Sequence, residues 1–268
     1  MNVTEPAVRR ARLLLAYDGS QFHGFAENRG VRTVAGALRE ALSLVCRRDV
    51  DITGAGRTDA GVHAWGQVVS CDLPPDTDLE NLPRRLTKLC APGIVVRSAE
   101  WTDPDFDARF SARWRHYRYV VVNDPVTDPF IAGTSWQVSE PLDLALMRLA
   151  CDPLIGEHDF SAFCRRPAHR SDQEPVSLRR RVLTAHWSER VSDTGQRLLV
   201  FEIRAQAFCH QMVRSIVGTV VDAGLRRLTP GEITGILLSR DRSRAGQVAP
   251  PQGLTLWEVG YGPEQVQN

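Results

Sequence analysis

The chain has 268 residues, of which 43% are apolar and 24% charged, and its formal net charge is +1. These proportions are typical of a globular protein, and they exclude a disordered chain, a collagen and a small disulfide-held scaffold. Lys88 is the single lysine, so arginine carries nearly all of the positive charge. Arginine binds phosphates and stacks on bases, although a GC-rich genome explains the same bias.

The six cysteines and seven histidines show no spacing that is typical of a metal site. No cysteine pair has C-x-x-C spacing and no histidine pair has H-x-x-x-H spacing, so zinc and thioredoxin-like motifs find no support. No apolar run approaches the ~20 residues that a membrane span needs. The sequence therefore predicts a soluble, cytoplasmic protein without metal.

The hydrophobic pattern predicts the order strand, helix, strand, strand, helix, strand in each half of the chain. In the first half the expected elements are 12–17, 34–45, 50–53, 66–73, 79–89 and 94–99. In the second half they are 117–122, 143–151, 182–189, 198–205, 210–224 (with a further helix at 232–239) and 254–259, and a long loop covers roughly 152–179.

This order is that of a ferredoxin-like βαββαβ unit. We therefore expect an α+β protein with a mostly antiparallel sheet, flanking helices and two βαββαβ halves. The expected domains are 11–105 and 106–262. The two halves share no sequence identity, so the repeat is one of architecture.

The segment Gly54–His63 reads Gly-Ala-Gly-Arg-Thr-Asp-Ala-Gly-Val-His and lies between two predicted strands. It matches neither a dinucleotide-binding fingerprint nor a phosphate-binding P-loop. Its glycines permit a sharp turn that presents Arg57 and Asp59 together, and loops on a rigid sheet often carry binding and catalytic groups. Judged on spacing alone, the favoured interpretation is that Asp59 caps the turn.

Two later segments carry candidate binding groups. Residues 109–118 contain four arginines and no acid, interleaved with Trp114 and Tyr117, which is typical of sites for single-stranded nucleic acid but also of an amphipathic strand. In 207–218 an apolar helical stripe is flanked by His210, Arg214 and Gly218 at i, i+4 spacing. Gly218 is small enough to admit a neighbouring element, which would place Arg214 at the edge of the buried face.

These segments together resemble the tRNA pseudouridine synthase A family. The likeness runs in order from about Leu13 to Val259 and is most specific in 56–63. It includes the segments 17–20, 54–63, 106–110 with 117–119, 156–163, 208–218 and 249–254. The chain departs from the family pattern at Gly24-Phe25-Ala26, where relatives usually carry Gly-Trp-Gln, and in 164–182.

The resemblance implies a role for each matching residue. Asp59 corresponds to the catalytic aspartate, Tyr117 to the tyrosine that stacks on the target base, and Arg214 to the basic residue that pairs with the aspartate. Arg57 corresponds to the arginine that helps evert the base. The expected substrate-binding residues are Tyr117, Arg57, His63, Arg109 and Arg113.

The implied activity is isomerisation of uridine to pseudouridine at positions 38–40 in the anticodon stem-loop of tRNA. The implied fold has a central RNA cleft, and the implied enzyme is a homodimer. This reaction exchanges no electrons or atoms with a second reactant, so no cofactor is expected. Two other hypotheses stay open. A catalytically silent RNA-binding protein would bind tRNA without changing it. A glycosidic hydrolase would need two carboxylates, whereas the Gly54–His63 loop offers one.

Overall fold

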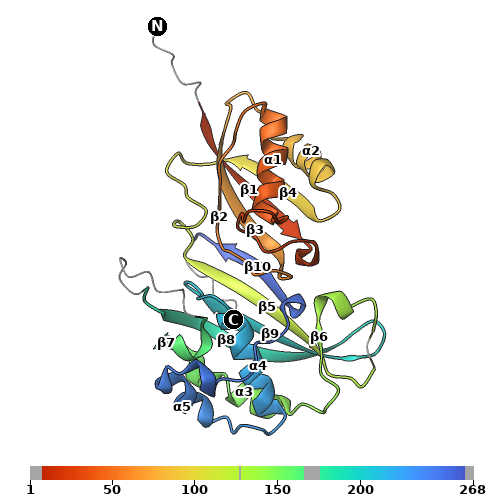
Figure 1. Ribbon diagram of the computed structural model, residues 1–268, viewed down its shortest axis with the longest axis vertical. Coiled ribbons are helices and arrows are strands. Elements are labelled where there is room, and N and C mark those ends of the chain that lie inside the picture. The colour runs from red at the N-terminus through yellow and green to blue at the C-terminus, as the bar shows by residue number, and fades with distance from the viewer. Residues whose placement is uncertain (1–7, 127, 166–175, 263–268) are drawn as a thin grey trace. The chain divides into compact units, whose positions relative to one another are not determined.

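The computed structural model describes residues 8–126, 128–165 and 176–262 (Figure 1). The chain forms two compact units, Met1–Arg113 with Leu256–Asn268 and Trp114–Thr255. Both are built from helices and mostly antiparallel strands, so the expected α+β fold class is confirmed. The domain limits 11–105 and 106–262 stay a prediction.

The first unit has the predicted order of elements. They are β1 (Arg9–Tyr17), α1 (Val34–Cys46), β2 (Ile52–Gly54), β3 (His63–Leu73), α2 (Leu82–Cys90) and β4 (Ile94–Trp101). The strands lie in the order β4-β1-β3-β2, and each neighbouring pair is antiparallel. Strand β3 thus lies between β1 and β2, which is the split βαβ arrangement that the sequence pattern predicts.

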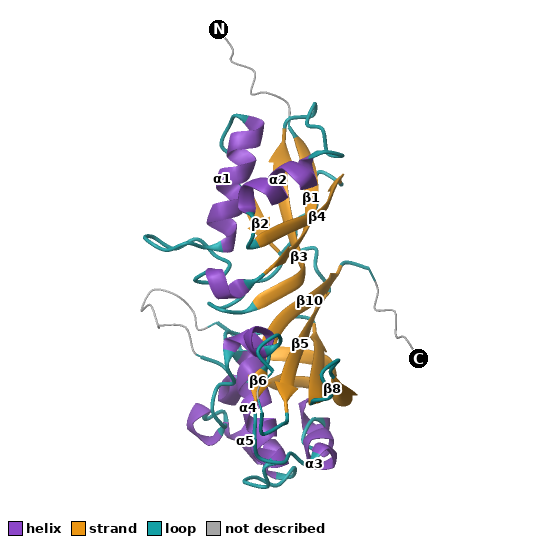
Figure 2. Cartoon of the chain, turned by 90° about the vertical axis from the view of Figure 1, so that its right-hand side faces the viewer, coloured by secondary structure: helices purple, strands orange, loops and turns teal. Residues whose placement is uncertain are grey.

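Helices α1 and α2 cover one face of this sheet (Figure 1 and Figure 2). Side chains alternate between the two faces along a strand, and in β1 Leu13 and Leu15 are fully buried while Arg12 and Leu14 are partly exposed. Helix α1 begins at Val34 because the Thr33 hydroxyl accepts a hydrogen bond from the Gly36 N–H at 3.2 Å. The sheet therefore has one helix-covered face and one open face.

The second unit contains more strands than the sequence pattern indicates. Its elements are β5 (Trp114–Val122), β6 (Trp136–Gln137), α3 (Leu144–Leu149), β7 (Gly156–Asp159), β8 (Arg179–Val191), β9 (Arg197–Ala205), α4 (Met212–Gly224) and α5 (Glu232–Ser239). The order is β5-β9-β8-β7 with antiparallel pairing, and β6 lies parallel to β5. Strand β10 (Leu254–Gly260) begins in this unit and ends in the first, beside β3.

Helix α4 is the most deeply buried helix of the second unit; Met212 and Ile216 are fully enclosed. Figure 2 shows α4 beside the strands of this unit. On the strands, Trp187 and Phe201 pack with ring centroids 5.0 Å apart, and Tyr119 is also fully buried. This core fixes the strand and the helix that carry Tyr117 and Arg214.

Three expectations differ from the structure. Strands β6 and β7, of two and four residues, are too short to show an alternating pattern, and β7 interrupts the loop expected over 152–179; residues 166–175 of that loop lie outside the described residues. Helix α4 begins at Met212 rather than at 210, because Gln211 has a left-handed backbone with φ of 63°.

Within the described ranges, no helix has the length and hydropathy to cross a membrane.

Candidate active site

The loop that carries Asp59 connects β2 to β3. Backbone pairing continues one residue past β2, where the Ala55 N–H donates to the Val68 carbonyl at 2.8 Å. At Gly54 the ring of Phe25 occupies the space that a Cβ atom would need. Any larger residue at this position would displace the ring, so glycine is required for close packing rather than for flexibility.

The middle of the loop is held through Thr58, which forms hydrogen bonds with residues outside the loop. Its carbonyl accepts from the Phe25 N–H at 3.0 Å, and its hydroxyl lies 2.8 Å from the Tyr17 hydroxyl. Burial raises the pKa of Tyr17 to about 12, although hydrogen bonds to Thr58 and Gln67 act in the opposite direction. Tyr17 therefore stays neutral at physiological pH and supports the loop as a hydroxyl group.

The end of the loop is a tight turn, in which the Val62 N–H donates to the Asp59 carbonyl at 3.1 Å. Arg57 is exposed and Asp59 is partly exposed, whereas Thr58 between them is buried. Hydrogen bonds of Thr58 thus hold the loop between an exposed arginine and a partly exposed aspartate.

His63 is only 7% exposed, and its Nδ1 accepts a hydrogen bond from the Gly19 N–H at 3.1 Å. The same nitrogen lies 3.1 Å from the Asp18 carboxylate. Because the backbone N–H of Gly19 is always a donor, Nδ1 of His63 is the acceptor in this bond. It therefore cannot also donate to the Asp18 carboxylate. His63 thus ties the first turn of the chain to the end of the loop, and contact with substrate stays a prediction.

Arg109 and Arg113 lie in the segment that follows β4. Ala108 is fully buried and its N–H donates to the Ser70 hydroxyl at 3.0 Å, which fixes the segment to β3. Arg109 is exposed and lies 5.2 Å from the ring of Phe110, itself 80% exposed. Arg113 is exposed too. An exposed aromatic ring beside arginine is the combination expected at an RNA-binding surface.

Tyr117 lies in the middle of β5 and is 7% exposed. Phe208 packs edge-on against its ring, with the centroids 4.9 Å apart and the planes at 84°. The ring orientation is therefore fixed by packing within the second unit. Tyr119, two residues further along the same face, is fully buried and its hydroxyl donates to the Pro250 carbonyl at 2.8 Å.

Arg214 lies in the first turn of α4 and is held by the segment that precedes β10. Its Nε donates to the Ala249 carbonyl at 2.7 Å, and its own carbonyl accepts from the Ala249 N–H at 3.1 Å. One turn later, a Cβ atom at Gly218 would overlap the Gln247 carbonyl. The small residue thus admits a neighbouring element, as the helical pattern predicts, and this element orients the Arg214 side chain.

The seven predicted site residues therefore divide between the units. Arg57, Asp59 and His63 share one loop of the first unit and Arg109 and Arg113 one later segment, while Tyr117 and Arg214 belong to the second. Sequence reasoning missed the residues that support the loop, namely Tyr17, Phe25 and Gln67. The sequence does contain a signal for Gln67, because an amide side chain stands out within an apolar strand such as β3.

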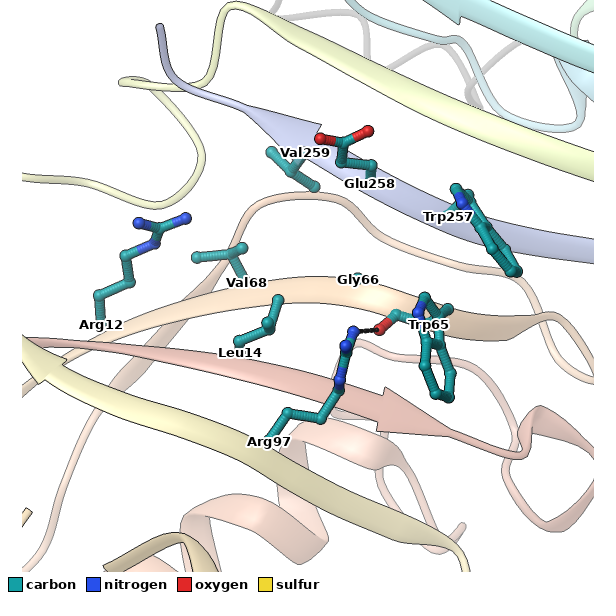
Figure 3. Close-up of a pocket in the computed structure, with 9 residues that line it drawn as sticks. All are labelled: Arg12, Leu14, Trp65, Gly66, Val68, Arg97, Trp257, Glu258 and Val259. Carbon is teal, nitrogen blue, oxygen red and sulfur yellow. Dashed lines mark hydrogen bonds between the residues drawn. The ribbon is translucent and has the colours of Figure 1, made fainter. Parts of the chain in front are cut away.

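A groove of about 320 Å³ crosses the open face of the first unit (Figure 3). Leu14 and Val68 line its floor, while the Arg97 guanidinium lies 4.2 Å from the ring of Trp65 and donates to the Trp65 carbonyl at 2.9 Å. Trp65 also stacks on Trp257 at 6.1 Å. None of the seven predicted residues lines this groove. In the described part of the chain, no cluster of His, Cys, Asp or Glu side chains could hold a metal ion.

Comparison with known proteins gives a consistent result. A family model described as tRNA pseudouridine synthase matches residues 14–111 and 150–262. The tRNA pseudouridine synthase A of Brevibacillus brevis is 38% identical over 254 residues, which cover 95% of this chain and 100% of that protein. The Corynebacterium glutamicum protein of the same name is 39% identical over 263 residues, which cover 94% of this chain and 89% of that protein.

Among solved structures, a Cbf5-Nop10-Gar1 complex aligns with a TM-score of 0.31 and 11% identity over 78% of this chain and 53% of that chain, too little to bear on the fold. The sequence matches define an enzyme of the isomerase class. The chain belongs to the tRNA pseudouridine synthase family.

Proposed function

We propose that this protein converts uridine to pseudouridine in tRNA, at positions 38–40 of the anticodon stem-loop. The observation that carries the proposal is the loop of Arg57 and Asp59. Hydrogen bonds of Ala55, Gly56, Thr58 and His63 hold this loop, while Arg57 is exposed and Asp59 is partly exposed. A family match with an intact and well-supported loop argues for a working enzyme rather than a silent RNA-binding protein.

The reaction breaks the bond between C1′ of the ribose and N1 of uracil, and it forms a bond between C1′ and C5. The C5 proton is lost and N1 gains a proton, so atoms and electrons balance within the substrate. A carboxylate serves this chemistry as a nucleophile on the sugar or as a base. We assign this role to Asp59, and we propose Arg214 as the basic residue that pairs with it, as the family resemblance implies.

The target uridine lies in a stem and must leave it before the base can turn. Flipping costs a few kcal/mol of stacking and pairing, which contacts in the pocket have to offset. We assign the stacking surface to Tyr117 and the eversion of the base to Arg57. Arg109 and Arg113 are the proposed phosphate contacts, which position the RNA without reading its sequence, and His63 completes the substrate-binding set.

Two further assignments follow from the family resemblance. We infer that the enzyme acts as a homodimer, so that one tRNA contacts both subunits. We also infer a cytoplasmic location, where tRNA is modified and where unpaired cysteines are stable.

Release of tritium from tRNA labelled at uracil C5 tests the proposal, because joining C1′ to C5 expels that label. We expect release by the unaltered protein and at least a 10⁴-fold slower release by Asp59→Ala, with tRNA bound by both. Binding without release by the unaltered protein, on several tRNAs, would identify a silent RNA-binding protein instead. Free uracil as the product would indicate a hydrolase.

A further inference from the structure

A buried amide lies directly beneath the loop that carries Arg57 and Asp59. Gln67 is in the middle of β3 and is completely buried. Its Nε2 donates to the Gly56 carbonyl at 2.7 Å, and its Oε1 accepts from the Gly56 N–H at 3.3 Å. The side chain thus pairs with both backbone groups of the residue that precedes Arg57.

These two bonds have the pattern of one rung of a β-ladder. Regular pairing of β2 with β3 stops at Gly54, and the Ala55 N–H still donates to the Val68 carbonyl. At Gly56 the chain leaves the sheet, and a side-chain amide takes over as its partner. Without Gln67, both backbone groups of Gly56 would lose this partner at the point where the loop begins.

The same amide joins a second support of the loop. Its Nε2 lies 3.5 Å from the Tyr17 hydroxyl, which in turn lies 2.8 Å from the Thr58 hydroxyl. A hydrogen-bonded chain therefore runs from Gly56 through Gln67 and Tyr17 to Thr58, on both sides of Arg57. The pKa of Tyr17 of about 12 keeps this chain in one protonation state over the physiological range.

Packing gives no reason for an amide at this position. The neighbours of Gln67 on β3, Val68 and Val69, are as deeply buried and apolar. A buried amide is unfavourable unless its hydrogen bonds are made, and those of Gln67 go to Gly56 and Tyr17. The residue type is therefore explained by the loop and not by the core.

We infer that Gln67 is a positioning residue of the reaction, which fixes the backbone at Gly56 so that Arg57 and Asp59 meet the flipped uridine in a reactive geometry. This inference rests on the proposed function. Because Gln67 is completely buried, we place it beneath the loop and not in contact with the substrate. A misplacement of about 1 Å at a reacting group can lower a rate by about 100-fold, so the predicted effect is on the chemical step.

The decisive variant is Gln67→Met, which keeps the length of an unbranched side chain and removes both amide groups. Single-turnover tritium release, with enzyme in excess over tRNA, separates the rate constant from the fraction of active protein. We expect a rate constant about 100-fold lower, with tRNA affinity changed by less than about threefold. At saturating enzyme, loss of folding alone would leave the rate constant unchanged and would raise the total enzyme concentration needed for saturation.

The matched control is Asn123→Leu in the second unit. Asn123 is also a buried amide that holds a loop, through bonds to the Val138 and Glu140 carbonyls at 2.9 and 2.8 Å. We expect it to lower the melting temperature without changing the rate constant. If Gln67→Met does not fold, Tyr17→Phe replaces it. This variant removes the hydroxyl that joins Gln67 to Thr58 and leaves both Gly56 bonds of Gln67 in place, so a rate constant about tenfold lower is then expected.

Hydrogen exchange of the Gly56 amide gives a readout that does not depend on activity. We expect it to exchange at least about tenfold faster in Gln67→Met than in the unaltered protein. If the unaltered protein modifies no tRNA but this difference is found, the proposed function fails and the fixing of the loop stands. Three results would overturn the inference. They are an unchanged rate constant in Gln67→Met, a decrease in the rate constant equal to that in Asn123→Leu, and unaltered hydrogen exchange of the Gly56 amide.

Discussion

At the scale of single residues, burial decides which polar groups of this protein are chemically active. Cys71 and Cys151 are buried, at 2% and 1% exposure, and burial raises the pKa of each thiol to about 12. A thiolate is disfavoured in an apolar environment because it loses its hydration. Cys71 and Cys151 are thus residues of the core.

We predict that Cys71 and Cys151 resist a thiol reagent at pH 8 in the folded protein and react fully after unfolding in guanidinium. The folded state holds these protons to a higher pH than the unfolded state, in which a thiol has a pKa of about 8.5. Their contribution to stability is therefore present below about pH 8.5 and is lost as the pH rises towards 12. Mass spectrometry of labelled peptides gives the test, and fast native labelling of either residue would contradict it.

At the scale of elements, three neighbouring strands of the second unit meet at one carboxylate. Glu202 of β9 lies 3.4 Å from Nε2 of His116 on β5 and of His186 on β8, and 2.9 Å from the Arg118 guanidinium. Hydrogen bonds from His116, then His186 and Arg118, hold the pKa of Glu202 well below its usual range, although burial acts in the opposite direction. This carboxylate therefore joins β5, β9 and β8 by hydrogen bonds.

We predict that Glu202→Gln lowers the free energy of unfolding by about 1–3 kcal/mol at pH 7. Because the pKa is lowered in the folded state, this stability is present above the unfolded pKa of about 4.3 and is lost as the pH falls below it. The difference in the free energy of unfolding between the unaltered protein and Glu202→Gln should thus become smaller below about pH 4. Urea unfolding at pH 7 and pH 3.5 measures it, and an equal difference at both values would refute the assignment.

A second contact between elements joins helix α4 to the segment before β10. We predict that Gly218→Ala destabilises the protein by about 1–3 kcal/mol and slows tritium release, since the added methyl group displaces Gln247 and with it the Ala249 carbonyl that holds Arg214. Gly235→Ala on α5 is the control. A Cβ there meets only the Arg244 side chain at 3.8 Å, so equal losses in the two variants would argue against the packing explanation.

At the scale of the whole molecule, a formal net charge of +1 gives little general attraction for RNA. Binding of tRNA must then depend on local groups of arginines, such as the exposed Arg109 and Arg113. Neutralising phosphates releases counterions, and the slope of log affinity against log salt reports how many are neutralised.

We therefore predict a salt-dependent tRNA affinity whose slope becomes smaller by about 2 in the double variant Arg109→Gln with Arg113→Gln. Arg39→Gln is the control, because Arg39 is already paired with Glu27 at 2.8 Å on α1. Filter binding at several salt concentrations measures both slopes. A slope that falls equally in the control would show that total charge, and not these two arginines, attracts the RNA.

Hydrophobic periodicity is local, so the sequence predicted the order of the helices and strands that are long enough to show a period. It also pointed to the Gly54–His63 loop, because this run of residues is specific to one family. It did not reveal β6 and β7, which are too short to show a period. It also did not reveal that Gln67, Tyr17 and Phe25 hold the loop, or that Ala249 holds Arg214. Those supports join residues up to 50 positions apart in hydrogen bonds such as Gln67 to Tyr17. Only the tertiary structure decides such pairs, since a hydrogen bond depends on distance in space and leaves no period in the chain.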